Sequence, residues 1–306
     1  MKSVKIKIKD KELQLNGEEI SKLNLDIKKN IIENYSILDN KPFKEIKRNK
    51  VKFNVLYDPE LIEFWKKYEV NKWENELIST IEKYVSKERY FIDIGAWIGP
   101  ITLYASKFAS KIIAFEPDPI AFNILKKNIE LNKNTGIFEK INLNQMAVGT
   151  DKNKTIDLYS SKFGNSGTSS ILDKNLDKIT VKSITLPDVV KKFNLEKEKI
   201  FFKIDIEGAE YDLLIKNLDL LKRLDCNLHF SLHPKNLAKQ FYKNNKSKFI
   251  GVFFYISTYF KIIRKLPFKY ILVNEKKISI IKLIIKSILY GLPGEVHIMC
   301  VNKLTK

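Results

Sequence analysis

Phe91-Ile-Asp-Ile-Gly-Ala-Trp-Ile-Gly99 is a compact apolar strand that runs into a glycine-containing turn. Gly95 lets the backbone bend tightly and approach a ligand, because it has no side chain. The turn leads into a helix, whose free N–H groups attract anionic groups. This order is typical of the first βα unit of an open parallel sheet, in which ligands bind beyond the carboxyl ends of the strands.

The segments that follow repeat this alternation of strand and helix. Asp118 and Pro119 supply an N-cap and a first-turn proline to the second helix, which we expect to reach about residue 131. We expect the strands at 90–94, 111–115, 141–148, 155–159, 179–186, 200–206, 227–232 and 296–302, with helices at 98–108 and from 209. Repeated βα units predict an α/β fold with a mostly parallel sheet and helices on both faces.

We divide the chain into an N-terminal extension, 1–85, and an α/β domain, 86–306, with a helical insertion at about 235–293. In the extension, the alternation of residues 4–8 and the Asn16-Gly17 turn predict a strand or hairpin. A strand is expected at 50–57 and a helical stretch at 59–87. The polar segment 163–170 is expected to form a loop.

The second strand ends in Phe115-Glu116-Pro117-Asp118-Pro119. An acidic residue about 20 positions after the glycine turn is placed to accept hydrogen bonds from both ribose hydroxyls of a cofactor. NAD would favour G-x-G-x-x-G, and Trp97 occupies the second glycine position, which argues against it. The end of the third strand, 146–149, is either an adenine wall or an ordinary strand end. The candidate cofactor contacts are Asp93, Gly95, Ala96, Trp97, Gly99, Glu116, Pro117 and Ala147.

The fourth strand carries Phe201-Phe-Lys203-Ile-Asp205-Ile-Glu207-Gly208-Ala-Glu210. Lys203, Asp205 and Glu207 would share one face, although a central parallel strand is normally apolar on both. Burying three ionisable groups is costly unless they pair or take part in chemistry. They therefore form either part of the site or a network that braces the sheet.

His233 follows the fifth strand, where a loop would direct it toward the pocket. As a neutral imidazole it could take a proton from a substrate hydroxyl, or it could simply cap the strand end. Asp205, Glu207 and His233 are thus the catalytic candidates, and His229 and His297 are expected to be packed within strands. The three candidates would suit Mn or Mg, but no spacing motif supports a metal and none is assigned.

At these motifs the sequence resembles the FkbM family of class I methyltransferases. The similarity rests on Asp93–Gly99, Phe115–Pro119 and Lys203–Glu210, and covers about 85–235 and the terminal strand. It implies a Rossmann-like, seven-stranded sheet with one antiparallel strand and S-adenosylmethionine as cofactor. It also implies O-methylation, frequently of a sugar hydroxyl in a glycan or natural product.

The resemblance also implies roles for individual residues. Asp93, Gly95 and Glu116 would contact the cofactor. Because the fifth and last strands are neighbours in class I enzymes, Cys226 and Cys300 would lie in adjacent buried strands as inert thiols.

The formal charge of +19 suggests a nucleic-acid partner or an anionic membrane surface. Only Arg48, Arg89, Arg223 and Arg264 contribute arginine, whereas phosphate readers rely on arginine for bidentate contacts. A nucleic-acid partner is therefore not expected. The stretch 278–289, with 249–260 and the basic 261–269, could rest on an anionic membrane, or could be an amphipathic cover of the core.

Two cysteines cannot build a disulfide framework, which favours a reducing cytoplasm. The first 17 residues lack the apolar stretch of a signal peptide, and no run of about 20 apolar residues predicts a membrane span. We expect a cytoplasmic protein, with the inner membrane surface as a possible location.

These features predict an S-adenosylmethionine-dependent methyltransferase that acts on a sugar hydroxyl of a glycan or glycolipid. An RNA methyltransferase and a non-catalytic cofactor-binding module are the alternatives. The acceptor is a small molecule or glycan, and the oligomeric state is left open.

Overall fold

The computed structural model describes residues 4–8, 11–15, 43–56, 58, 60–151, 155–160, 177–233, 257–258, 261–273, 276–277 and 296–304. The expected turn at Asn16-Gly17, the loop 163–170 and the amphipathic stretch 278–289 lie outside these residues, as does most of 249–260.

The main sheet confirms the predicted class I topology. Its strands, in spatial order, are β14 (Lys276–Lys277), β13 (Tyr270–Val273), β15 (Val296–Val301), β12 (Cys226–Leu232), β11 (Lys199–Ile204), β5 (Arg89–Ile94), β6 (Lys111–Phe115) and β7 (Ile141–Asn144). From β7 to β12 all neighbours are parallel, and β15 is antiparallel to both β12 and β13. Seven strands with β15 reversed match the expectation, and the two-residue β14 adds an eighth.

The region expected to be a helical insertion contributes two of these strands. Tyr270–Val273 pairs with β15, and Lys276–Lys277 pairs with Tyr270–Val273. The expectation of a helical insertion is therefore wrong for these residues. Periodicity does not distinguish a four-residue apolar run in a buried strand from part of a helix.

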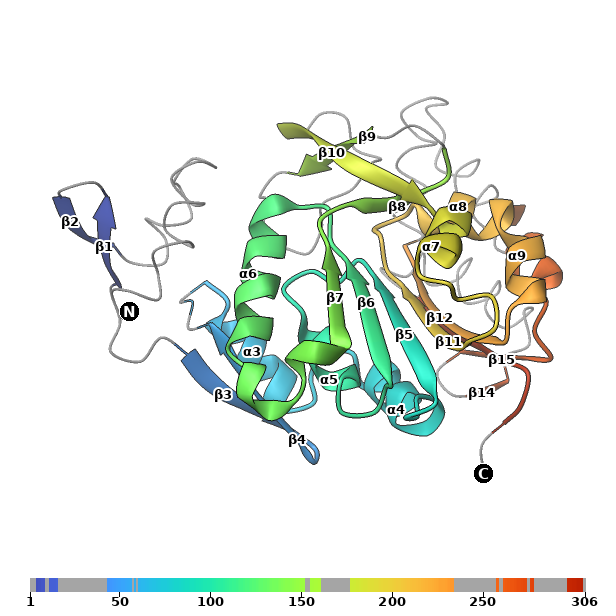
Figure 1. Ribbon diagram of the computed structural model, residues 1–306, viewed down its shortest axis with the longest axis horizontal. Coiled ribbons are helices and arrows are strands. Elements are labelled where there is room, and N and C mark those ends of the chain that lie inside the picture. Colours follow the sequence, from blue (N-terminus) through green and yellow to red (C-terminus); the bar gives the residue numbers. More distant parts are fainter. Residues whose placement is uncertain are drawn as a thin grey trace, which may run out of the picture.

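Side chains of the central strands alternate between the two faces of the sheet. Phe91 and Phe201 stack with ring centroids 5.3 Å apart and pack with α4 (Asn75–Tyr84), α5 (Pro100–Ala105) and α6 (Pro119–Glu130). Ile92 and Phe202 face the opposite way, toward α7 (Leu186–Lys192), α8 (Glu210–Lys216) and α9 (Leu218–Arg223). Two apolar layers thus hold the helices on both faces, as Figure 1 shows.

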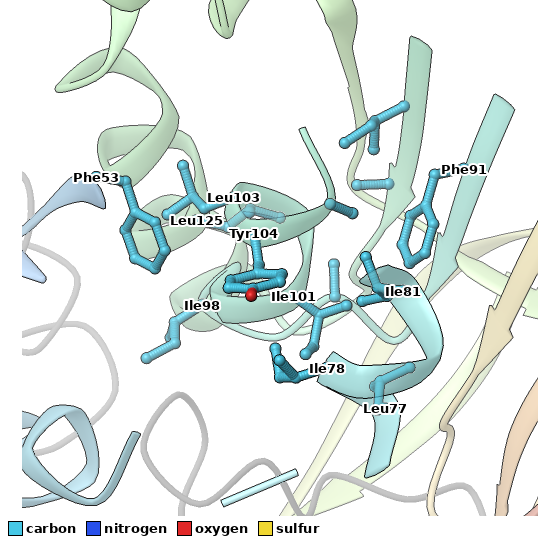
Figure 2. Close-up of a cluster of buried hydrophobic side chains, with 14 of the residues drawn as sticks. Phe53, Leu77, Ile78, Ile81, Phe91, Ile98, Ile101, Leu103, Tyr104 and Leu125 are labelled. Carbon is cyan, nitrogen blue, oxygen red and sulfur yellow. The ribbon is translucent and has the colours of Figure 1, made fainter. Parts of the chain in front are cut away.

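The N-terminal extension begins with the hairpin β1 (Val4–Ile8) and β2 (Lys11–Leu15), as predicted, and continues with β3 (Phe43–Arg48), β4 (Val51–Leu56) and α3 (Ile62–Glu69). From β3 on, its described residues share the core of the α/β domain. Figure 2 shows Phe53 of β4 and Leu77 of α4 in one apolar cluster with Phe91 and Tyr104. Residues 43–84 are therefore integral to one face of the fold.

The helix expected over 59–87 is two helices, α3 and α4. Asn71 adopts a left-handed φ of 57°, and the N–H of Lys72 returns to the carbonyl of Lys67 at 2.9 Å. Asparagine tolerates this conformation better than most residues, so it ends α3 with a Schellman-like turn. Asn71 could have indicated the end of α3, but the apolar periodicity continues past it and predicted one long helix.

The strand expected over 141–148 is also divided. β7 ends at Asn144, and β8 (Ala147–Gly149) instead pairs with β10 (Asp177–Thr185), which is antiparallel to β9 (Thr155–Ser160). Figure 1 shows β9 and β10 at the top, above the main sheet. Two short 3-10 turns, Lys133–Thr135 and Phe138–Lys140, link α6 to β7. No helix among the described residues has the length and apolarity to cross a bilayer.

Candidate active site

A cavity of about 580 Å³ opens at the carboxyl ends of β5, β6 and β11. Its size is that of a small-molecule site. Of the candidate cofactor contacts, six line it: Gly95, Ala96, Trp97, Glu116, Pro117 and Ala147. The catalytic candidates Asp205, Glu207 and His233 line it as well. Asp93 and Gly99 are not among its wall residues and lie behind the glycine turn.

The glycine turn is fixed by close packing against the fourth strand. Gly95 has φ +83°, and a Cβ added there would lie 1.8 Å from the carbonyl oxygen of Asp205. The N–H groups of Gly95 and Ala96 both donate to the carbonyl of Phe115, at 3.0 and 2.9 Å. Gly99 has φ +91°, and a Cβ there would lie 2.5 Å from the Leu125 side chain. Gly95 is therefore required by space as well as by conformation, whereas Gly99 is required by its conformation, because the Leu125 side chain can move.

Asp93 supports the turn from below. It is fully buried, and its Oδ2 accepts a hydrogen bond from Thr102 at 2.6 Å. Its Oδ1 lies 3.2 Å from the Nζ of Lys203. Burial raises the pKa of Asp93, against the opposing effects of Lys203 and Thr102. Asp93 thus supports Lys203 and Thr102 next to the glycine turn and does not line the cavity.

Glu116 presents a buried carboxylate to the cavity. Its two oxygens accept hydrogen bonds from the backbone N–H groups of Trp97, at 2.7 Å, and Asp118, at 2.8 Å. Burial, together with the charge of Asp118, raises the pKa of Glu116 to about 8. Asp118 caps α6 by accepting from the N–H groups of Ile120 and Ala121, as predicted.

Lys203 joins the two candidate motifs. Its Nζ donates to the carbonyl of Gly95 at 2.5 Å and lies 3.2 Å from Asp93 and 3.9 Å from Asp205. Burial alone would lower the pKa of Lys203, but these two carboxylates outweigh it and raise that pKa. Lys203 thus links the fourth strand to the glycine turn, and both Lys203 and Asp205 line the cavity.

The turn after β11 is held by Glu210, which the sequence reasoning did not single out. Its buried carboxylate accepts from the N–H groups of Ile206 and Gly208, each at 2.8 Å. Between them, Glu207 has a left-handed φ of 55°. The available signal was an acidic residue in the first turn of α8, where free N–H groups need acceptors.

His233 converges on this turn from the end of β12. Its Nδ1 lies 3.0 Å from Glu210, and its Nε2 lies 3.6 Å from Asp205 and 3.7 Å from Glu207. Burial disfavours a charged imidazole, but the hydrogen bond with Glu210 and the neighbouring carboxylates raise the pKa of His233 to about 10. This direction favours the protonated imidazole at neutral pH, whereas the sequence suggested a neutral base.

The other histidines and the cysteines lie within strands, as expected. His229 is buried, and burial together with His297 and Lys203 keeps its pKa well below the usual value. Cys226 in β12 and Cys300 in the adjacent β15 are buried free thiols. Burial raises the pKa of both, to about 12 for Cys226. These thiols are unreactive by environment.

The N-terminal extension supplies a wall of the cavity that sequence reasoning missed. Phe64, Trp73 and Glu74 line the cavity. The Phe64 ring lies 4.6 Å from that of Trp97 and 5.0 Å from that of Trp73, both edge-on. The sequence shows that aromatic residues cluster in 64–73. It does not show that they line the cavity, because their position depends on the break between α3 and α4.

The cavity is acidic although the chain as a whole is basic. Among the described residues, its wall contains only Lys203 and His233 as basic groups. Seven acidic residues line it: Glu74, Glu116, Asp118, Asp151, Asp205, Glu207 and Asp212. The excess of lysine over acidic residues in the chain is thus reversed at this site.

Comparisons with known proteins point to methyltransferases. A family model described as the methyltransferase FkbM domain matches residues 93–270. Methyltransferase 1 of Beauveria bassiana (strain ARSEF 2860) is 27% identical, over 42% of this chain and 57% of that protein. Methyltransferase sdnD of Sordaria araneosa is also 27% identical, over 41% of this chain and 59% of that protein. The chain therefore spans less than two thirds of the length of each relative.

Among solved structures, methyltransferase FkbM from Methylobacillus flagellatus KT is similar with a TM-score of 0.36 and 16% identity. The match covers 57% of this chain and 45% of that one. This similarity is too low to bear on the activity.

Proposed function

This chain belongs to the FkbM methyltransferase family, and from that premise we propose that it transfers a methyl group from S-adenosylmethionine to a sugar hydroxyl of a glycan or glycolipid. The family match covers more than half of the chain. The cofactor, the acceptor and the roles of individual residues are proposals that the geometry of the cavity supports.

The cavity suits the proposed cofactor at two points. The glycine turn lines the cavity at Gly95, Ala96 and Trp97, and the close packing of Gly95 against the carbonyl of Asp205 fixes its position there. Glu116 offers a buried carboxylate whose remaining lone pairs can accept hydrogen bonds from the two ribose hydroxyls. Ala147 and Pro117, also in the wall, can pack against the adenine ring.

The chain's own residues position the acceptor and remove its proton. When bound, S-adenosylmethionine supplies an electrophilic methyl group on a sulfonium, whose sulfur keeps the electron pair of the broken bond. Asp205 and Glu207 line the cavity and can accept a hydrogen bond from the acceptor hydroxyl, then take its proton as the oxygen forms the new bond to carbon. Lys203 holds Asp205 beside the glycine turn.

The acidic wall of the cavity favours a sugar over RNA as the acceptor. Carboxylates repel the phosphates of RNA in a site with little water, whereas they accept hydrogen bonds from the neutral hydroxyls of a sugar. The aromatic rings of Phe64, Trp73 and Trp97 add an apolar surface on which a sugar ring can pack. The high positive charge of the chain lies outside this site and does not select its acceptor.

Peripheral contact with an anionic membrane is a second part of the proposal. Lys261, Arg264, Lys265 and Lys269 are exposed on one short described segment. Each basic group near an anionic surface contributes about 1 kcal/mol to binding. A membrane position would bring a lipid-linked glycan to the cavity. Sedimentation with anionic and with neutral vesicles tests it, and equal binding to both would contradict it.

The activity is tested with labelled methyl groups and separate fractions of glycan, glycolipid and RNA from the source cell. We expect label in a carbohydrate that a glycosidase releases. Asp205→Asn should lower turnover about 100-fold while leaving cofactor affinity unchanged. Asp219→Asn, an exposed carboxylate of α9 outside the cavity, is the matched control.

Two outcomes would overturn the proposal in different ways. Label in RNA and in no carbohydrate would contradict the acceptor and favour the RNA methyltransferase alternative. Cofactor binding without transfer to any fraction would favour a non-catalytic module.

A further inference from the structure

Four side chains from two elements converge at the edge of the cavity. Asp205, Glu207 and Glu210 follow β11, and His233 follows β12. One ligand atom from each of Asp205, Glu210 and His233 falls in a group that spans no more than 4.8 Å. Glu210 and His233 are buried, whereas Asp205 and Glu207 retain 25% and 20% exposure toward the cavity. The cluster thus has a rigid back and an accessible front.

The back of the cluster sets the orientation of the imidazole. Glu210 is held by the backbone N–H groups of Ile206 and Gly208, so its carboxylate has little freedom to move. Its Oε1 lies 3.0 Å from the Nδ1 of His233. A carboxylate that accepts from one ring nitrogen while the other faces an opening is the arrangement that orients metal-bound histidines.

At the front of the cluster, two carboxylate oxygens lie near one ring nitrogen. The Nε2 of His233 is 3.6 Å from the Oδ1 of Asp205 and 3.7 Å from the Oε2 of Glu207, which is longer than a normal hydrogen bond. Ligand atoms bound at about 2.1 Å and separated by 90–110° lie roughly 3.0–3.4 Å apart. Binding of a cation therefore requires the side chains of Asp205 and Glu207 to rotate until their oxygens reach that spacing. The Oδ2 of Asp205 is meanwhile directed to Lys203, at 3.9 Å.

We propose that His233, Asp205 and Glu207 bind a divalent cation, Mg²⁺ or Mn²⁺, with Glu210 as the residue that orients the imidazole. Two carboxylates and one imidazole are a donor set that suits these ions, which also keep water ligands. The remaining positions face the cavity. The cation replaces the proton that the carboxylates otherwise favour on Nε2.

This site deepens the proposed function on which it rests, because it names the acceptor's chemistry. A cation at the front of the cluster coordinates a hydroxyl and lowers its pKa, so that the carboxylate oxygen of Glu207 that does not bind the cation can take the proton more easily. Two hydroxyls on adjacent carbons can bind one cation together. The acceptor class is therefore a vicinal diol of a sugar rather than an isolated hydroxyl.

The experiment uses the full chain, Mn²⁺ alone as probe, and electron paramagnetic resonance to count bound ions. We expect one Mn²⁺ per chain, with affinity lowered about tenfold or more in Asp205→Asn and His233→Gln. Glu210→Gln should lower it about tenfold by loosening the imidazole. Asp219→Asn should bind as the unaltered chain does. Melting curves identify any variant that does not fold, and titration of the unaltered chain remains decisive in that case.

The outcomes separate this site from the methyltransferase proposal. No bound Mn²⁺ at about 1 mM overturns the metal site, as does full methyl transfer in excess chelator. Mn²⁺ bound equally by Asp205→Asn and Asp219→Asn also overturns it. Calorimetry with S-adenosylmethionine, performed on the same samples, tests the cofactor proposal independently. Cofactor binding without Mn²⁺ binding would leave the proposed function standing and the metal site refuted.

Discussion

At the scale of single residues, the candidate site depends on residues that packing and hydrogen bonds hold in place. Gly95 lies against the carbonyl of Asp205, and Glu116 is buried between two backbone N–H donors. Each residue therefore combines a structural requirement with a proposed contact to the cofactor. Substitutions at these positions separate the two effects, provided that a control with the same backbone change is available.

Gly95→Ala should destabilise the fold by about 2 kcal/mol or more, because the new Cβ meets backbone at 1.8 Å and φ is +83°. It should also abolish cofactor binding. Gly136→Ala is the matched control, since φ is +69° but nothing lies within 4 Å. That change should cost only about 1 kcal/mol. Urea unfolding of both variants measures the difference, and equal losses would contradict the packing argument.

The affinity for S-adenosylmethionine should rise with pH up to about 8. The ionised form of Glu116 is the better acceptor for ribose hydroxyls, and its pKa of about 8 means that it is protonated below that pH. Each unit of pH below 8 then weakens binding by up to about tenfold. Calorimetry between pH 6 and 9 measures this slope. Glu116→Gln should bind more weakly and lose the slope, and an unchanged slope in that variant would refute the role of Glu116.

At the scale of elements, two asparagines, one in α6 and one just after its C-terminal end, attach β4 of the β3–β4 hairpin to this helix. Asn132 accepts from the N–H of Asn54 at 2.8 Å and donates to its carbonyl at 2.7 Å. Asn128 accepts from the N–H of Leu56 at 2.6 Å. Side-chain amides thus satisfy an edge of β4 that would otherwise need another strand. Sequence patterns did not indicate this, because an amide on a helix carries no mark of its partner.

Asn132→Ala should destabilise the protein by roughly 2 kcal/mol, since it leaves the N–H and carbonyl of Asn54 without these hydrogen bonds. Asn134→Ala, an exposed position in the following turn, should change stability by less than about 0.5 kcal/mol. Denaturant titration of the two variants checks this. A loss in Asn134→Ala as large as that in Asn132→Ala would show that the attachment is unimportant.

At the scale of the whole molecule, the fold determines which residues are buried from solvent. β12 and β15 are buried at every residue except His297, and they carry the two cysteines of the chain. The same architecture places an acidic cavity at one edge of a basic molecule. Neither property follows from composition, because both depend on which residues the fold turns inward.

Cys226 and Cys300 should not react with a thiol reagent in the native protein, because both are buried and their pKa values are raised. Both should react once denaturant unfolds the chain. The reaction rate in intermediate denaturant should follow global unfolding, since central strands open only with the whole sheet. Rapid labelling of either thiol under native conditions would show local opening at β12 or β15.

The sequence alone was sufficient to predict the features that depend on residues close together in the chain. The glycine turn, the cap at Asp118 and the compact apolar strand around Phe91 are set by local backbone chemistry, and all were predicted. Glu116 was placed because strand ends in a parallel sheet meet at one edge. The breaks in 59–87 and 141–148 were missed because periodicity persists across a turn.

Only the tertiary structure decided which distant groups meet and what charge they carry. Lys203 reaches the carbonyl of Gly95, 108 residues away, and Glu210 reaches His233, 23 residues away. Burial lowers the pKa of His233, but the hydrogen bond with Glu210 and the charges of Glu210, Asp205 and Glu207 outweigh it, and no spacing rule connects these carboxylates to the histidine. Contacts of this kind depend on how the chain folds back on itself, and burial then sets the energy of each charge.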